Sequence, residues 1–238
     1  MNSQSESSAH SSQDGPAAIE ITSLTFRWDN HEPTISFPDL SLPRGEHLFL
    51  HGSSGTGKST FLSLLAGMLP PATGTIGLLG TNIHQLSAGK RDRFRADHIG
   101  VIFQQFNLVP YLTAEANVTL PCRLSALRRA ATGENPTMEA QRLLTALAIP
   151  ESHWQRKVTQ LSIGQQQRIA AARALIGAPE IILADEPTSA LDSENRDRFI
   201  NLLLAMAEAR NTSVLFVSHD RALAHHFHHQ IQLGQVPA

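Results

Sequence analysis

Two kinds of apolar pattern occur along this chain. Near the N-terminal end, apolar and polar residues alternate over 19–28 and 35–42, and turn-forming residues at 31–34 separate the two stretches. A period of two is typical of half-buried strands, so this part predicts a pair of antiparallel strands. Later stretches are short and almost entirely apolar, which is typical of strands buried on both faces. These stretches are 47–50, 99–103, 180–185 and 213–217, and a further short strand is expected at 74–80.

Helical segments alternate with the buried strands. Residues 193–209 predict a helix between the last two of them, and such alternation indicates a mostly parallel sheet covered by helices on both faces. A longer helical stretch runs over about 113–154. We therefore expect one α/β domain over 18–238 with a helical subdomain at about 105–175. Its helical signals are Pro136, typical of a first turn, and the 3.6-residue period of Ala140, Leu143, Leu144 and Leu147.

The composition narrows the classes of partner. The 238 residues carry 19 lysines and arginines against 21 acidic residues, and this charge balance predicts no nucleic-acid partner. The basic clusters 90–95 and 128–129 are interpreted as solvated helix faces. No apolar run approaches about 18 residues, so we expect no direct membrane insertion. Residues 1–17, poor in apolar side chains, predict a disordered tail, and the single cysteine, Cys122, is expected to be buried.

The segment GSSGTGKST at 52–60 carries the strongest chemical signal. It follows the apolar stretch 47–50 and opens a helical segment, so its glycines can turn backbone N–H groups toward phosphate at a helix N-terminus. Lys58 can reach the terminal phosphates, and the Ser59 hydroxyl can ligate Mg²⁺. We expect a nucleotide triphosphate site formed by Gly52, Ser53, Ser54, Gly55, Thr56, Gly57, Lys58, Ser59 and Thr60.

Polar residues follow the other buried strands. Asp185 and Glu186 end the stretch 180–185, and ligands of parallel sheets collect at the carboxyl ends of strands. We expect Asp185 to hold Mg²⁺ and Glu186 to polarise an attacking water. Gln104, directly after the strand at 99–103, is placed to sense Mg²⁺ and that water. His219 follows the strand at 213–217 and can hydrogen-bond the γ-phosphate.

The segment LSIGQQQR at 161–168 precedes an alanine-rich helical run. Ser162 and Gly164 offer a hydroxyl and close backbone access at a helix N-terminus, which indicates a second anion site. A plain helix-capping turn is the alternative interpretation of the same residues. Two half-sites in one chain suggest that each is completed by another chain.

The order of these motifs resembles that of the ABC-type ATP-binding domain over about 19–234. The resemblance implies a P-loop NTPase core with a mostly parallel sheet, an antiparallel β subdomain and a helical signature subdomain, with ATP and Mg²⁺ as cofactors. It implies a head-to-tail dimer, in which ATP held by Lys58 and Ser59 of one copy meets the signature motif of the other. The residues that it adds to the nucleotide site are Trp28, stacking on adenine, with Ser162, Gly164, Gln165 and Asp192.

Within that family, IGVIFQQFNLVPYL at 99–112 and EANV at 115–118 resemble the lipoprotein-release and macrolide-export ATPases. This resemblance implies a separate membrane permease as partner and a cytoplasmic position on the inner face of the membrane. The apolar stretch 106–111 either forms a docking groove for that permease or fills its own core.

Three functions fit the motifs. The leading hypothesis is an ATPase that powers export, release or mechanotransmission by a permease; the alternative is an ATP-dependent regulator without cargo transport, as in cell-division ABC complexes. A nucleic-acid ABC protein would carry coiled-coil, zinc-bearing or duplicated segments, which this length does not hold. The histidines of 225–229 are interpreted as surface side chains rather than a metal site, with Ala222, Leu223 and Phe227 forming a packing face.

Overall fold

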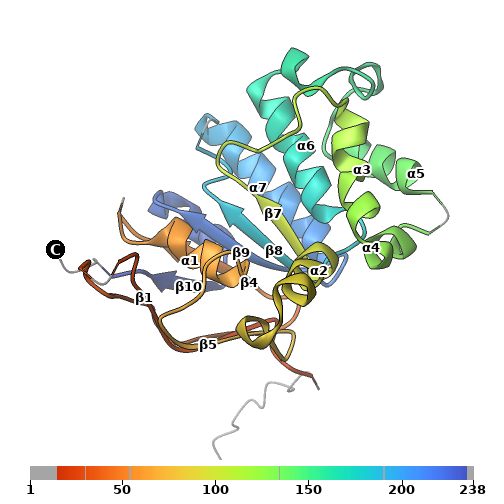
Figure 1. Cartoon of the computed structure of the whole chain (residues 1–238). Helices are drawn as coiled ribbons and strands as arrows, with labels where there is room; N and C mark the ends of the chain where they lie inside the picture. The colour runs from red at the N-terminus through yellow and green to blue at the C-terminus, as the bar shows by residue number, and fades with distance from the viewer. Residues whose placement is uncertain (1–14, 30, 54, 134, 190, 235–238) are drawn as a thin grey trace, which may run out of the picture.

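The computed structural model describes residues 15–29, 31–53, 55–133, 135–189 and 191–234, and it places them in two sheets with helices between and around them (Figure 1). The expected tail lies mostly outside the described residues. One sheet is antiparallel throughout and is centred on β1, as the alternating pattern predicts. Its strands are β1 (Ile19–Phe26), β2 (Ile35–Ser36), β3 (Leu40–Leu42), β5 (Thr73–Leu78) and β6 (Thr81–Asn82).

The prediction of a single strand at 35–42 is wrong, because the structure has two short strands there, β2 and β3. Both pair with β1, but the register of β1 shifts between Thr22 and Thr25, where Ser23 has φ 50°. The Ser23 N–H donates to the Asp39 carboxylate at 2.6 Å instead of to a strand. Pro38, between the two short strands, has no N–H to offer a ladder.

The second sheet is parallel throughout, with the order β10-β4-β9-β8-β7. Its central strands are the predicted apolar stretches. The sequence analysis missed the edge strand β10, because only one of its four residues, Ile231, is even partly buried. The five strands are β4 (His47–His51), β7 (Ile99–Ile102), β8 (Ile181–Asp185), β9 (Ser213–Ser218) and β10 (His229–Gln232).

Helices cover both faces of the parallel sheet. One helix, α1, lies between the two sheets, whereas α3, α5, α6 and α7 lie on the opposite face (Figure 1). Pro136 starts α5, and its predicted apolar face is fully buried, as is Cys122. The helices are α1 (Lys58–Leu65), α2 (Ala88–His98), α3 (Ala114–Leu124), α4 (Ala126–Ala131), α5 (Pro136–Ala146), α6 (Ile163–Leu175) and α7 (Ser193–Glu208), with 3₁₀ turns η1 (Ile83–Gln85), η2 (Glu151–His153), η3 (Val158–Gln160) and η4 (Arg221–His226).

A buried arginine attaches α4 to the C-terminal end of α6. The Arg128 guanidinium donates to the carbonyls of Ala174 at 2.7 Å and Ile176 at 2.6 Å, and burial lowers its pKa to about 10. The expectation that residues 128–129 form a solvated face is therefore wrong for Arg128, which is 3% exposed. The physical reason is that the last carbonyls of a helix have no partner within the helix and need donors. The other basic cluster, on α2, lies as expected on a helix without buried residues.

The histidine segment at 225–229 differs in part from expectation. Leu223 and Phe227 are buried as predicted, but Ala222 is exposed, since η4 is a 3₁₀ turn and its side chains follow a period of three. The side chain of His226 is only 7% exposed and contacts α7. Among the described residues no cluster of histidine, cysteine and carboxylate side chains could hold a metal ion. In the same part of the chain no helix combines the length and apolar character needed to cross a bilayer.

We predict that an ion pair between α2 and the residue preceding β8 makes stability depend on pH. His98 Nδ1 lies 3.0 Å from Glu180 Oε2, and this hydrogen bond raises the pKa of His98 against the opposing effect of burial. Because the folded pKa exceeds the unfolded one, the stabilisation is complete below about pH 6.5 and is lost as pH rises through the folded value. His98→Gln should therefore lower the free energy of unfolding more at about pH 6 than at about pH 9.

Urea titrations at both pH values measure this difference. The exposed His31→Gln is the control, and it should give the same small change at each pH. An equal destabilisation by His98→Gln at both pH values would contradict the prediction.

Candidate nucleotide site

A cavity of about 730 Å³ opens at the carboxyl ends of the parallel strands. It brings together most of the predicted site residues from five separate segments of the chain. The parallel register explains this convergence, since β4, β8 and β9 end side by side and Gln104 follows β7. The described residues that line the cavity are Trp28, Ile35, Ser53, Gly55, Gly57, Lys58, Ser59, Thr60, Gln104, Glu186 and His219.

The phosphate loop forms one wall of the cavity. Gly55 and Gly57 have φ 83° and 87°, a region that disfavours other residues, and Gly57 caps the N-terminus of α1. Gly52 does not share this conformation; it is required for space, since a Cβ there would lie 2.6 Å from the Thr56 hydroxyl. Ser54 lies outside the described residues. The loop thus directs the positive end of a helix into the cavity, as binding of an anionic phosphate requires.

The ammonium group of Lys58 connects the phosphate loop to Glu186, the residue that follows β8. It donates to the carbonyls of Gly52 at 2.9 Å and Ser53 at 3.1 Å. The same Nζ lies 3.8 Å from Glu186 Oε1, and both side chains are 10% exposed. The cavity therefore holds a cation and a carboxylate at one point, both shielded from most of the solvent.

Three groups fix the carboxylate of Glu186. Its backbone has φ 45°, and its N–H donates to Val217 in β9 at 2.9 Å. The Ser218 hydroxyl donates to Oε2 at 3.1 Å, and His219 Nδ1 lies 2.9 Å from Oε1. The sequence analysis missed Ser218, because a serine at a strand end has no distinctive signal. Such a carboxylate has one defined orientation, from which it can polarise a water molecule.

Asp185 and Ser59 fit a divalent cation. Burial raises the pKa of Asp185, opposed by a hydrogen bond with Ser59 that lowers it. The Asp185 Oδ1 atom is buried and has no hydrogen-bond partner among the described residues. A buried, unpartnered carboxylate oxygen beside a hydroxyl is the donor set that Mg²⁺ prefers. Gln104, which is exposed and lines the cavity, adds a third oxygen nearby.

Trp28 lies just beyond β1, and its ring is available to a planar ligand. The ring is 60% exposed and lines the cavity. It packs edge-to-face against Phe26, with ring centroids 5.0 Å apart. An edge-to-face contact occupies at most one face of the indole ring. The exposed part of the ring can therefore stack on a base.

The signature residues lie elsewhere in the chain's own structure. Ser162, Gly164, Gln165 and Asp192 are not among the residues that line the cavity. Ser162 and Gln165 form a capping box at the start of α6, which confirms the helix-capping interpretation of this segment. Asp192 caps α7, accepting from the Asn195 N–H at 3.0 Å. A capping box leaves other N–H groups of the first helical turn without intrahelical partners, so the anion-site interpretation stays open.

A second cavity, of about 750 Å³, lies between α2, β7 and α3. We call it the lateral groove. Within the stretch 106–111, Asn107 lines the groove but the apolar residues do not: Phe106 is 8% exposed and belongs to the core, whereas Tyr111 is 74% exposed. The groove combines apolar side chains with arginines. Its lining includes Phe103, Leu120, Pro121, Leu124, Arg93 and Arg95.

The matches to known proteins agree with this site. A family model described as ABC transporter matches residues 37–189. The chain therefore belongs to the ABC transporter family, as an ATP-binding and ATP-hydrolysing domain. The expected fold class and the expected ATPase activity are confirmed.

Several relatives extend over most of the chain. The ABC transporter ATP-binding protein YtrE of Bacillus subtilis is 37% identical over 205 residues, covering 86% of this chain and 87% of that protein. The lipoprotein-releasing system ATP-binding protein LolD of Colwellia psychrerythraea is 36% identical over 219 residues, covering 91% and 82%. The expected similarity to lipoprotein-release ATPases is thereby confirmed.

A solved structure shares the fold at the same level of identity. The cassette MJ0796, which comes from Methanocaldococcus jannaschii, is known as a dimer in a post-hydrolysis state bound to ADP and Pi. It superposes with a TM-score of 0.81 at 36% identity, covering 92% of this chain and 97% of that one.

Proposed function

We propose that this chain is the ATP-hydrolysing subunit of a transporter and drives a separate membrane permease from the inner face of the membrane. The observation that carries the proposal is the shielded carboxylate of Glu186, held between Lys58, Ser218 and His219 in a cavity formed by the phosphate loop. Family membership supports the link to a permease.

Each residue of the cavity has its own role in ATP binding or hydrolysis. Lys58 and the N–H groups of the phosphate loop bind the β- and γ-phosphates, and Trp28 stacks on adenine. Glu186 orients the attacking water and accepts its proton as the oxygen approaches phosphorus. His219 contacts Glu186 through Nδ1 and reaches the γ-phosphate with its other ring nitrogen, so it lies between the two groups. Gln104 positions the same water from the loop after β7, the strand that pairs with β8.

Ser59 and Asp185 would hold Mg²⁺, assisted by Gln104. An ion at this position would supply positive charge to neutralise phosphate oxygens during transfer. Support comes from the buried, unpartnered Oδ1 of Asp185 beside the Ser59 hydroxyl. Burial is the main reason that the pKa of Asp185 is raised, and the neighbouring carboxylate of Glu186 raises it further.

A second copy of the chain completes each site. Ser162 and Gly164 of one copy, with Gln165 and Asp192, face the γ-phosphate held by Lys58 of the other. Two observations support this head-to-tail pairing: the signature residues lie away from the chain's own cavity, and the related cassette MJ0796 is a dimer.

The lateral groove is the surface that we assign to the permease. It is hollow, it exposes Leu124 at 64%, and it borders Phe103, which directly precedes Gln104. Binding there acts on the loop that carries Gln104. Relatives named for lipoprotein release support cargo that is released from or moved out of the membrane.

Glu186→Gln tests the catalytic assignment. The amide keeps the shape of the side chain but cannot accept the proton of the water, so we expect kcat to fall about 100-fold or more. ATP affinity should be retained, and a closed dimer should accumulate in ATP. Steady-state ATPase assays and size-exclusion chromatography measure both results. The matched control is Glu194→Gln, whose carboxylate is 74% exposed; near-normal turnover by Glu186→Gln would refute the assignment.

Ser162→Arg tests the shared site. A bulky cation at the start of α6 should block closure and abolish turnover, while ATP affinity of the isolated subunit, measured by calorimetry, stays nearly intact. Mixing this variant with Lys58→Ala gives heterodimers that keep one intact composite site, and partial recovery of activity is expected. A Ser162→Arg monomer that hydrolyses ATP at the wild-type rate would overturn the head-to-tail dimer.

Leu124→Asp tests the permease. We expect the wild-type chain, purified from solubilised membranes, to retain a polytopic membrane protein, and the variant to lose it because a charge enters the lateral groove. Basal ATPase activity should not change. The control is Met138→Asp, a residue on α5 that is 53% exposed and does not line the groove. Equal retention by both variants would contradict the assigned surface, and absence of any membrane partner from the wild type would contradict the function.

A further inference from the structure

An ion pair links the start of α7 to the loop that carries His219. Arg196 lies four residues after Asp192, and its Nη1 donates to the carboxylate of Asp220, the residue that follows His219. The Arg196 side chain is 19% exposed and that of Asp220 is 36% exposed. The pair Arg198–Glu194, on the same helix, is more than 70% exposed on both sides. Solvent therefore screens the Arg196 pair much less, and its geometry is the more restrictive of the two.

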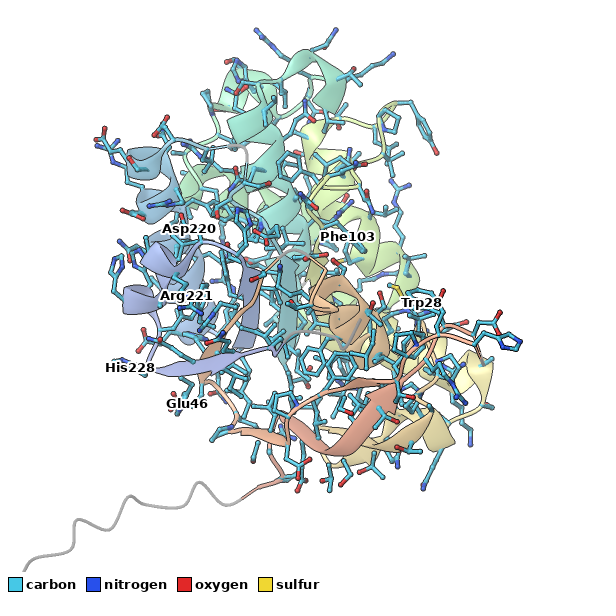
Figure 2. The ribbon with its side chains drawn as sticks, turned by 90° about the vertical axis from the view of Figure 1, so that its left-hand side faces the viewer. Trp28, Glu46, Phe103, Asp220, Arg221 and His228 are labelled. Carbon is cyan, nitrogen blue, oxygen red and sulfur yellow. The ribbon has the colours of Figure 1, made fainter. Side chains whose placement is uncertain are left out.

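Asp220 links Arg196 to the residues of the nucleotide cavity. Its Oδ1 accepts from the Ala222 N–H at 3.0 Å, which caps η4, and its own N–H donates to the Ser218 hydroxyl at 3.2 Å. That hydroxyl donates in turn to Glu186 Oε2 at 3.1 Å. In Figure 2, Asp220 lies next to Arg221 at the start of η4, well separated from Trp28. Arg196 thus reaches the cavity through a chain of bonds rather than by direct contact.

His219 has little else to hold it. Its side chain is 63% exposed, and Glu186 Oε1, at 2.9 Å, is its one hydrogen-bond partner among the described residues. An exposed imidazole with a single partner samples other rotamers unless its backbone is fixed. The backbone on either side is fixed by Ser218, bonded to Glu186, and by Asp220, bonded to Arg196.

The far end of η4 is attached to α7 as well. His226, its last residue, lies 2.9 Å from Asn201 Oδ1 through Nδ1 and 3.4 Å from Asp197 Oδ1 through Nε2. Arg196 Nε lies 3.4 Å from that same oxygen of Asp197. Both ends of η4 therefore follow α7, whose first turn begins directly after Asp192.

We propose that Arg196 is a positioning residue that ties the Asp192 loop and α7 to His219 through Asp220. The inference rests on the function proposed above for His219 and Glu186. When a second copy contacts the Asp192 loop, the first turn of α7 and the His219 loop respond as one unit. His219 then meets the γ-phosphate only when the dimer interface is in place.

The test is a mutant cycle measured by ATPase kinetics on the full chain. Arg196→Ala should lower kcat about tenfold, with KM for ATP within about twofold, because coupled neighbours of this kind interact at that level. Asp220→Asn, which keeps an oxygen for the cap of η4, should lower kcat similarly. The double variant should be no worse than either single one, since both changes break the same link.

Two further variants separate positioning from folding. Arg196→Lys restores a cation and should recover part of the lost kcat, and its melting temperature should match the wild type. In a His219→Ala background, Arg196→Ala should cause no further loss, because its effect runs through His219; a purely structural role would lower activity again. The matched control is Arg198→Ala, which removes the exposed pair of the same helix and should leave kcat unchanged.

The outcomes separate this inference from the proposed function. If Arg196→Ala has the kcat of Arg198→Ala, or if its loss adds fully to that of Asp220→Asn or His219→Ala, the positioning role is overturned. In that case Glu186→Gln and His219→Ala still lose activity, and the catalytic assignment stands. If those two variants are themselves fully active, the proposed function fails first.

Discussion

The parallel register of the second sheet is the constraint on which the nucleotide cavity depends. His51 of β4 pairs with Ser218 of β9, and Asp185 of β8 pairs with Val217, one residue earlier on the same strand. The residues that follow these strand ends must therefore emerge at one edge of the sheet, within reach of one another. Gly52, Glu186 and His219 are distant in sequence, yet they need no further device to meet. A slip of one residue would turn each side chain to the opposite face.

This placement puts the carboxylate of Glu186 in a site that is shielded from solvent. The carboxylate therefore needs partners among the surrounding groups. A buried charge is costly unless it is paired and hydrogen-bonded. Glu186 satisfies this condition with the ammonium of Lys58 and hydrogen bonds from Ser218 and His219. Its backbone is held at φ 45°, a conformation that a glutamate rarely adopts. The pairing also fixes both oxygens of the carboxylate of a residue that lines the cavity, so structural and chemical requirements coincide here.

The sequence predicts what depends on neighbours in the chain and misses what depends on distant partners. The phosphate loop, the apolar strands and the face of α5 are local patterns, and the structure has them where expected. Arg128 looks like any surface arginine, because the carbonyls of α6 that bury it are more than 40 residues away. The burial of His226 depends on contacts with α7, which are likewise distant in sequence. The edge strand β10 has no buried face, so its sequence carries no strand pattern. The division of 35–42 into two strands depends on the register of β1, which no local pattern records.

Helix α6 joins the lateral groove to the signature residues. Ser162 caps its N-terminus, and near its C-terminus Arg173 donates to the carbonyls of Phe106 at 2.6 Å and Asn107 at 2.7 Å. Both carbonyl residues have positive φ and follow closely after Gln104, so the arginine holds a strained loop in place. A helix of 13 residues spans about 20 Å, which is the distance between these two ends of α6. Arg173 and Asn107 both line the lateral groove, so one arginine side chain belongs to the groove, to the loop that follows Gln104 and to the helix that begins at Ser162.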